Sequence, residues 1–261
     1  MATAVGHAPG RGRFAGLVWT LVRTDFKSRY HGTAAGFLWA LLKPFVMFAV
    51  LMAVFSFIFV SEPHYKIKLI IGLFLYDFFV DSTRTGLLSL IAKGYLLTKA
   101  RTPSWIIVVT SSSNAVITAS IFVAVIVGFM TLSGRPPSWQ GIVLFFYYLC
   151  HYVVMVVGIS LATSVLHLRY RDLNQVWEVL TQAGFFIAPV IYPLDVLPER
   201  FHFYLYLWPP TPIIQFSRAV LIDGTVPTAR AHLFLFLETV VILGAGVLIF
   251  RRYAPRAAEY L

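Results

Sequence analysis

The chain has 261 residues, of which 59% are hydrophobic and 12% are charged, and its mean hydropathy is +0.78. Soluble domains carry about 25% charged residues, so the composition excludes a water-soluble enzyme and predicts an all-α integral membrane protein. The net charge of +10 could suit nucleic acid, but the basic residues lie mostly between apolar runs, and we expect no nucleic-acid partner.

The first predicted element is an amphipathic helix over residues 14–31. Its apolar side chains share one broad arc of a helical wheel, whereas Arg23 and Lys27 lie on the opposite arc. Asp25 and Arg29 intrude on the apolar arc, but their i, i+4 spacing allows them to pair. We expect this helix to lie at the membrane interface with its basic face toward anionic headgroups.

Six apolar stretches follow, each near the roughly 20 residues that a helix needs to cross the hydrocarbon core. The predicted membrane spans cover residues 36–60, 69–91, 105–132, 141–166, 176–194 and 233–250. Six spans place both termini on one side of the membrane. The excess of Lys and Arg in the connections on that side predicts that both termini are cytoplasmic.

The segment between the last two spans, residues 198–224, is too apolar for a solvated loop and too short and proline-broken to cross twice. Apolar runs of roughly 10–14 residues are commonly interfacial or re-entrant. We predict two short re-entrant helices, over about residues 199–207 and 212–221, that dip in from the outer face. The alternative is a pair of helices lying flat at the headgroups.

The second predicted span contains Asp77, Asp81 and Arg84, which lie on one helical face because they are spaced i, i+4 and i+7. Charges at bilayer depth are costly and normally face a bundle interior or a wet cavity. The face could therefore line a polar route or tie this span to a neighbour. It could equally form a structural ion pair within the span.

The sequence predicts no catalytic residue and no metal site. The seven histidines lack H-x-x-x-H spacing, the single cysteine excludes a thiolate cluster, and no nucleophile elbow is present. Glu238 is a lone acid in the last span, and we predict that it pairs with Arg218 or Arg230. The chain also lacks the G-x-x-x-x-G-K-[ST] loop that cradles nucleotide phosphates, so transport would need a partner or an ion gradient.

Four stretches carry a family resemblance when they are taken together. They are RTDFKSRYHGTAAGFLWALLKP (23–44), SLIAKGYLLTKARTP (89–103), RYRDLNQVWEVLTQAGFFIAPVIYP (169–193) and FRRYAPRAAEYL (250–261). In this order they resemble the type-2 ABC-transporter permeases that export polysaccharides. That family includes the O-antigen, capsule and wall teichoic acid exporters, and the resemblance covers nearly the whole chain.

The resemblance implies a homodimeric permease in the bacterial cytoplasmic (inner) membrane, assembled with two copies of a separate ATPase subunit. ATP and Mg²⁺ would be bound by that partner, with no cofactor in this chain. The substrate would be a glycan linked to a lipid pyrophosphate, moved from the cytoplasmic side outward.

The resemblance also implies three groups of site residues. The lipid headgroup would meet the basic end of the first helix, at Arg23, Lys27, Arg29 and Tyr30. Spans one and five line the channel in that family, which implies a channel-lining role for Phe37, Trp39, Phe185, Phe186 and Tyr192. The spacing on span two adds Asp77, Asp81 and Arg84 as candidate channel-lining residues. The ATPase would couple through Lys93, Lys99, Arg101, Arg171 and Asp172.

Simpler alternatives stay open for each group. The coupling residues could belong to ordinary basic cytoplasmic loops, and any single aromatic could face lipid. For the whole protein, the alternative function is a proton-gradient-driven secondary transporter that uses Asp77, Asp81 and Arg84 as a relay. A membrane-embedded enzyme is a third possibility, although no residue spacing points to one.

Overall fold

The structure is a computed structural model that describes residues 16, 18–24, 37–98 and 103–259. Within these ranges the chain is helical and contains no β-strand. The long helices are α2 (Phe37–Phe55), α3 (Tyr65–Ala92), α5 (Ser104–Leu132), α6 (Trp139–Arg169), α7 (Leu173–Ile187) and α10 (Ala229–Tyr253). The short elements are α4 (Gly94–Thr98), η1 (Leu194–Val196), α8 (Glu199–Tyr206), α9 (Pro210–Arg218), η2 (Ala219–Asp223) and η3 (Ala254–Glu259).

Each predicted span falls on one of the six long helices, with shifted bounds. Among the described helices, α5, α6 and α10 are long and apolar enough to cross a membrane. α3 has 28 residues, but its charged residues lower its apolar character, and α2 contributes a shorter apolar stretch at Leu42–Phe55. The number of crossings and the re-entrant depth of α8 and α9 stay predictions.

The fifth span ends earlier than predicted. α7 stops at Ile187 after 15 residues, whereas the predicted span runs to residue 194. Ala188 is extended, with φ −70° and ψ 125°, because a residue that precedes proline is driven out of the helical region. Residues 188–193 are therefore non-helical backbone, and their carbonyl groups need partners from elsewhere in the protein.

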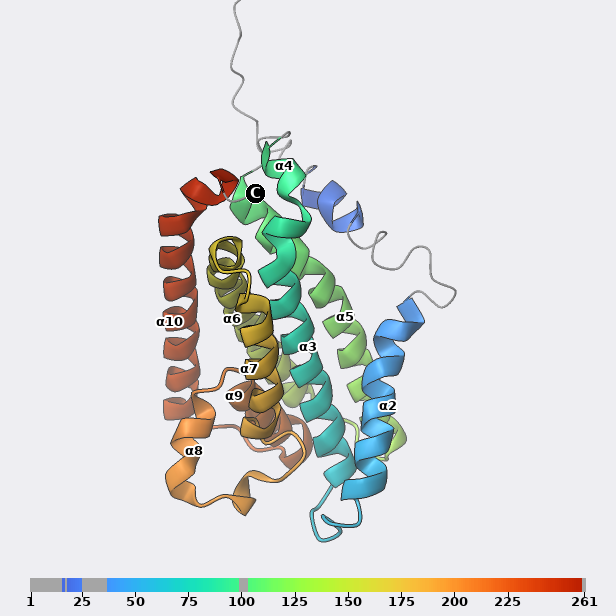
Figure 1. The fold of residues 1–261 in the computed structure, drawn as a ribbon. Helices are drawn as coiled ribbons and strands as arrows, with labels where there is room; N and C mark the ends of the chain where they lie inside the picture. Colours follow the sequence, from blue (N-terminus) through green and yellow to red (C-terminus); the bar gives the residue numbers. More distant parts are fainter. Residues whose placement is uncertain (1–15, 17, 25–36, 99–102, 260–261) are drawn as a thin grey trace, which may run out of the picture.

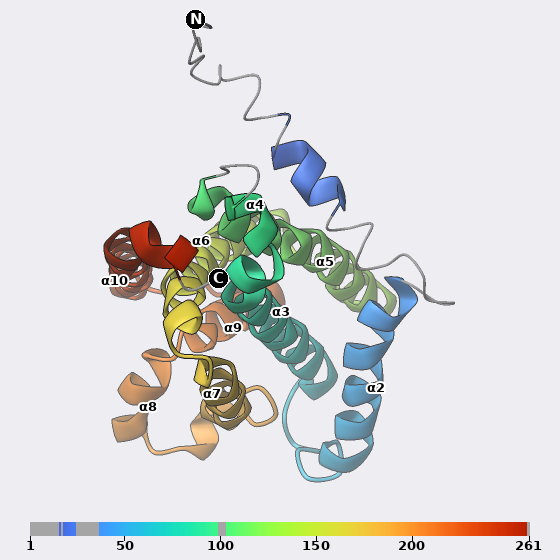
Figure 2. The same ribbon diagram turned by 45° about the horizontal axis from the view of Figure 1, so that its top comes forward.

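α3 lies in the middle of the bundle. It contacts α2, α5, α6, α7 and α9, and Figures 1 and 2 show α2 and α10 on opposite sides of the assembly with α3 between them. Residues 69–76 of α3 are all buried, as expected for a helix that is apolar on every side. α8 and α9 lie at one end of the bundle, and α4 and η3 lie at the other (Figure 1).

We call residues 188–193 the break after α7. One buried arginine donates hydrogen bonds to carbonyl groups of this break. The guanidinium of Arg218, at the end of α9, donates to the carbonyl oxygens of Pro189 (2.6 Å) and Val190 (2.8 Å). It also donates twice to the Lys68 carbonyl of α3, at 3.0 and 2.8 Å. Arg218 is only 5% exposed, so these carbonyls replace the water that would otherwise solvate its charge.

Two residues of α3 complete this arrangement. The Tyr65 hydroxyl donates to the Ile191 carbonyl at 2.8 Å, which satisfies the next carbonyl along the break. A side chain at Gly72 would overlap the Arg218 guanidinium. Near its start, α3 therefore supplies the Tyr65 hydroxyl as a donor and leaves space for the Arg218 side chain at Gly72. Both features allow α9 and the break after α7 to pack closely against α3.

A close backbone contact joins α6 to α10. A Cβ on Gly246 of α10 would overlap the Gly158 carbonyl of α6, and a Cβ on Gly158 would overlap the backbone at Ile242 and Leu243. Small residues let membrane helices approach in this way, so that dispersion forces and backbone contacts stabilise the pair. Gly244, two residues from Gly246, has nothing within 4 Å of its own Cβ position.

Replacing Arg218 by Gln removes the buried charge and the donors to the Pro189 and Val190 carbonyls of the break and to the Lys68 carbonyl of α3. We expect the free energy of unfolding to fall by about 3 kcal/mol, because a buried carbonyl without a donor costs roughly 1–3 kcal/mol. This fall corresponds to an unfolding midpoint lowered by roughly 6–12 °C. Thermal unfolding of the detergent-purified protein, followed by tryptophan fluorescence, measures this shift. The control is R200Q, because Arg200 is exposed on α8; equal midpoints for both variants would contradict the role of Arg218.

Replacing Gly246 by Ala should destabilise the α6–α10 contact, since the methyl group has no room beside the Gly158 carbonyl. Overpacking of this kind costs roughly 1–3 kcal/mol. The matched control is G244A in the same helix, which should be neutral or slightly stabilising because Ala is the better helix former. Thermal unfolding of both variants tests the contact, and a G246A midpoint equal to that of G244A would argue against it.

Candidate functional site

The charged face of α3 connects to two different helices. Asp77 lies 3.5 Å from the Lys43 ammonium of α2, and Arg84 lies 3.9 Å from the Glu178 carboxylate of α7. Asp81, between them, is half-buried. These two ion pairs therefore connect α3 to α2 and to α7, and whether this face also forms a pair within the span stays a prediction.

α2 and α7 lie on either side of α3 in both ribbon views (Figures 1 and 2). Asp77 and Arg84 are two helical turns apart, so the two ion pairs lie at different depths along α3. Lys43 is largely exposed, and Arg84 and Glu178 are about half-exposed. Such ion pairs contribute little to stability where water reaches them. Their arrangement instead produces a polar strip on α3, bordered by α2 and α7.

α7 is also held to α3 by uncharged polar contacts. The Trp177 indole donates to the Thr83 hydroxyl at 3.0 Å, and the Tyr76 hydroxyl donates to the Thr181 carbonyl. Buried polar groups of this kind require defined partners. These bonds fix the rotation of α7, so that its opposite face is directed away from α3.

The predicted aromatic residues divide between two environments. Trp39 of α2 is 61% exposed and Phe186 of α7 is 67% exposed, so both lie on outward faces of their helices. Phe185 turns inward, with its ring 5.3 Å from that of Tyr76. The Tyr192 hydroxyl donates to the Phe186 carbonyl at 2.7 Å, and Phe37 begins α2 with a side chain outside the described set.

The predicted headgroup site lies mostly outside the described residues. Residues 16 and 18–24 are helical, with Leu21 buried and Arg23 exposed, as an amphipathic helix requires. Lys27, Arg29 and Tyr30 fall outside the described ranges. Their grouping with Arg23 stays a prediction.

The predicted coupling residues that the structure describes lie at one end of the bundle. Lys93 directly follows α3, and its ammonium donates to the Ser111 hydroxyl of α5 at 2.6 Å. α4 follows and contacts η3 near the end of the chain (Figure 1). Arg171 and Asp172 are exposed in the turn between α6 and α7, whereas Lys99 and Arg101 lie outside the described ranges.

One charged residue was missed by the sequence analysis, and another was predicted to have the wrong partner. Glu178 is not named in the sequence analysis. A lone acid in an apolar span is costly without a partner, so this residue indicates a contact with another helix. The predicted pairing of Glu238 with Arg218 or Arg230 is wrong. The Arg218 guanidinium bonds to carbonyl groups instead, and both Glu238 oxygens are buried without a hydrogen-bond partner among the described residues.

Within the described part of the chain, no group of three or more His, Cys, Asp or Glu side chains could hold a metal ion. The polar strip on α3 contains oppositely charged groups in pairs rather than a nucleophile beside a base. Chemically, the charged groups of this strip can interact with other polar or hydroxyl-bearing groups.

Comparison with known proteins identifies relatives along nearly the whole chain. The family model for the ABC-2 type transporter matches residues 16–222. The O-antigen export system permease protein RfbA of Klebsiella pneumoniae is 26% identical over 246 residues, which cover 94% of this chain and 95% of that protein.

Two further relatives come from other organisms. RfbA of Myxococcus xanthus, also an O-antigen export system permease protein, is 26% identical over 254 residues, or 95% of this chain and 96% of its own. The polysialic acid transport protein KpsM of Escherichia coli is 21% identical over 240 residues, covering 90% of this chain and 92% of its own. The family match spans more than half of the sequence, and the chain therefore belongs to the ABC-2 type transporter family.

Proposed function

We propose that this chain is the transmembrane permease subunit of an exporter that moves a lipid-linked polysaccharide, such as an O-antigen or a teichoic acid, out of the cytoplasm. The proposal rests on the similarity of 94–95% of the chain to O-antigen export permeases of two organisms. A homodimer in the bacterial inner membrane, with both termini cytoplasmic, would form the conduit. Two copies of a separate ATPase would bind ATP and Mg²⁺ and supply the energy.

The conduit would lie between the outward faces of α2 and α7 in the two copies. Both faces carry exposed apolar and aromatic side chains, including Trp39 and Phe186, and a second copy could cover them. Aromatic faces offer an apolar surface to sugar C–H groups without a strict hydrogen-bond pattern. The polar strip on α3 would solvate sugar hydroxyl groups as the glycan passes.

The ATPase would push on the end of the bundle that carries α4 and the α6–α7 turn. α4 continues directly from α3, so a displacement of α4 is transmitted to the helix that contacts both α2 and α7. The basic face at Arg23, Lys27, Arg29 and Tyr30 would receive the pyrophosphate headgroup at the same membrane surface.

Charge reversal at the predicted coupling sites should separate ATP hydrolysis from export. In the double variant R101E/R171E we expect glycan export to fall about ten-fold, a typical size for the coupling between two sites. Hydrolysis by the co-purified ATPase should persist without stimulation by substrate. The control is R230E, because Arg230 is exposed in the first turn of α10, whereas η3 and the coupling end of the bundle lie at the other end of this helix.

Surface glycan per cell and ATP turnover of the purified complex measure the two effects. Wild-type protein should co-isolate with an ATP-hydrolysing subunit. Export by this chain alone after ATP depletion would refute the proposed function, whereas normal export by R101E/R171E would refute only the coupling sites.

The Lys43–Asp77 pair offers a second test. K43D and D77K each place like charges together, and each should lower export by roughly five-fold, equivalent to about 1 kcal/mol. The combined swap K43D/D77K should recover part of the loss if the pair positions α2 against α3. Export assays with equal membrane expression measure the double-mutant cycle.

The same assay discriminates the proton-driven alternative. A relay through Asp81 predicts that D81N and dissipation of the proton gradient both abolish export while ATP is maintained. We expect export to continue under both conditions, since the ATPase supplies the energy.

A further inference from the structure

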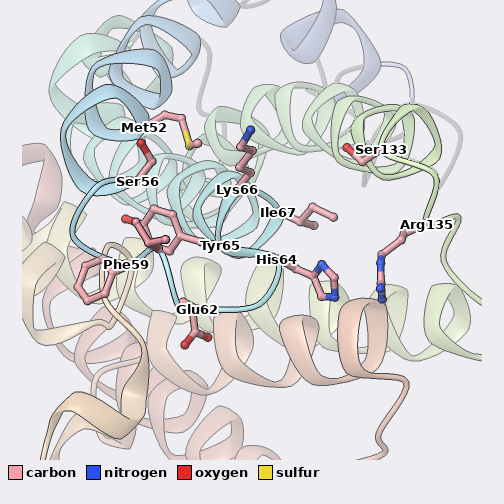
Figure 3. A pocket seen from close by; sticks show the side chains of 11 residues that line it. Met52, Ser56, Phe59, Glu62, His64, Tyr65, Lys66, Ile67, Ser133 and Arg135 are labelled. Carbon is pink, nitrogen blue, oxygen red and sulfur yellow. The ribbon is translucent and has the colours of Figure 1, made fainter.

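A cavity of about 380 Å³ lies at the end of the bundle where α2 is connected to α3 and where α5 ends (Figure 3). Three nitrogen-bearing side chains contribute to its wall: His64 and Lys66 at the start of α3, and Arg135 from the α5–α6 connection. The hydroxyl-bearing residues Ser56 and Ser133 also line it. None of these residues belongs to the proposed conduit or to the coupling end.

The cavity has an excess of positive charge. Its one acidic residue, Glu62, is paired with the Lys68 ammonium at 2.5 Å, so this carboxylate is already neutralised. No ion pair joins Lys66 or Arg135 to a residue in the described part of the chain. Two cations that share a cavity with no anion to balance them favour an anionic ligand.

The backbone at His64 has an uncommon conformation beside this cavity. Among the described residues, His64 is the only non-glycine residue with positive φ, at 59°, a conformation that is uncommon outside glycine. It turns the chain abruptly into α3. Figure 3 shows the His64 ring and the Arg135 guanidinium directed toward the same part of the cavity, although they come from different connections.

The surroundings of the cavity are apolar and exposed. Phe57 of the α2–α3 connection is 81% exposed, and Leu132, at the end of α5, is 90% exposed; Ile58 and Val60 are also exposed. Cationic side chains beside exposed apolar ones are the pattern of a membrane interface, where the apolar groups contact acyl chains and the cations reach the phosphates.

We propose that this cavity binds the phosphate group of a membrane lipid. Arg135 and Lys66 would contact the phosphate oxygens, Ser56 and Ser133 would donate hydrogen bonds, and the exposed apolar side chains would contact the acyl chains. The volume lies within the range of about 300–1,000 Å³ found for small-molecule sites. The proposal does not depend on the proposed transport function, because any phospholipid at this surface could occupy the cavity.

The test measures lipid binding to purified, delipidated protein by native mass spectrometry. Wild-type protein is titrated with a short-chain phosphatidylglycerol and with diacylglycerol of the same chain length, which lacks the phosphate. We expect phosphatidylglycerol to bind at least about ten-fold more tightly than diacylglycerol. The variant K66Q/R135Q should lose about ten-fold in phosphatidylglycerol affinity, since each cation near a lipid surface contributes measurably.

The matched control is R200Q/R230Q, which removes two exposed cations outside the cavity and should bind phosphatidylglycerol like the wild type. Equal binding by wild type and K66Q/R135Q, or equal binding of both lipids to the wild type, would overturn the proposal. The lipid comparison needs no variant, so it stands even if K66Q/R135Q proves unstable.

Two more probes identify the source of the phosphate. Inorganic phosphate that displaces phosphatidylglycerol at equal concentration would make this a free-anion site and would overturn the assignment to lipid. A polyprenyl pyrophosphate that displaces phosphatidylglycerol would retain the lipid-phosphate site and extend it to the carrier lipid of the transported glycan.

Discussion

The structure depends on the hydrogen bonds that the carbonyl groups of the non-helical backbone after α7 accept. Pro189 removes a helical hydrogen bond and ends the helix, so carbonyl groups would be orphaned inside a membrane protein. Arg218 and Tyr65 supply the donors. Because Arg218 also bonds to Lys68 of α3, one guanidinium joins α9, the break after α7 and the central helix.

This constraint explains the composition of α3. Its first turns must admit the guanidinium, and Gly72 leaves the required space. Its middle carries the charged residues that contact α2 and α7. The positions of α2 and α7 therefore depend on their contacts with α3. In the proposed exporter, α2 and α7 would border the conduit.

The two ends of the bundle have different chemistry. One end has the α4–η3 contact and the exposed charged residues Arg171 and Asp172. The other has the break after α7, α8 with exposed Phe203 and Tyr204, and the cationic cavity at Arg135. In the proposed exporter, this asymmetry would place the ATPase and the release of the glycan at opposite ends of the bundle.

The sequence by itself determined the helical class, the position of the long helices and the family, because hydropathy over about 20 residues and the order of short motifs are local properties of the chain. It also placed Asp77, Asp81 and Arg84 on one face, since helical spacing is local. Only the tertiary structure decided their partners. The contacts of Lys43 with Asp77 and of Arg218 with carbonyl groups join residues that are far apart in sequence, and no periodicity encodes which helices become neighbours.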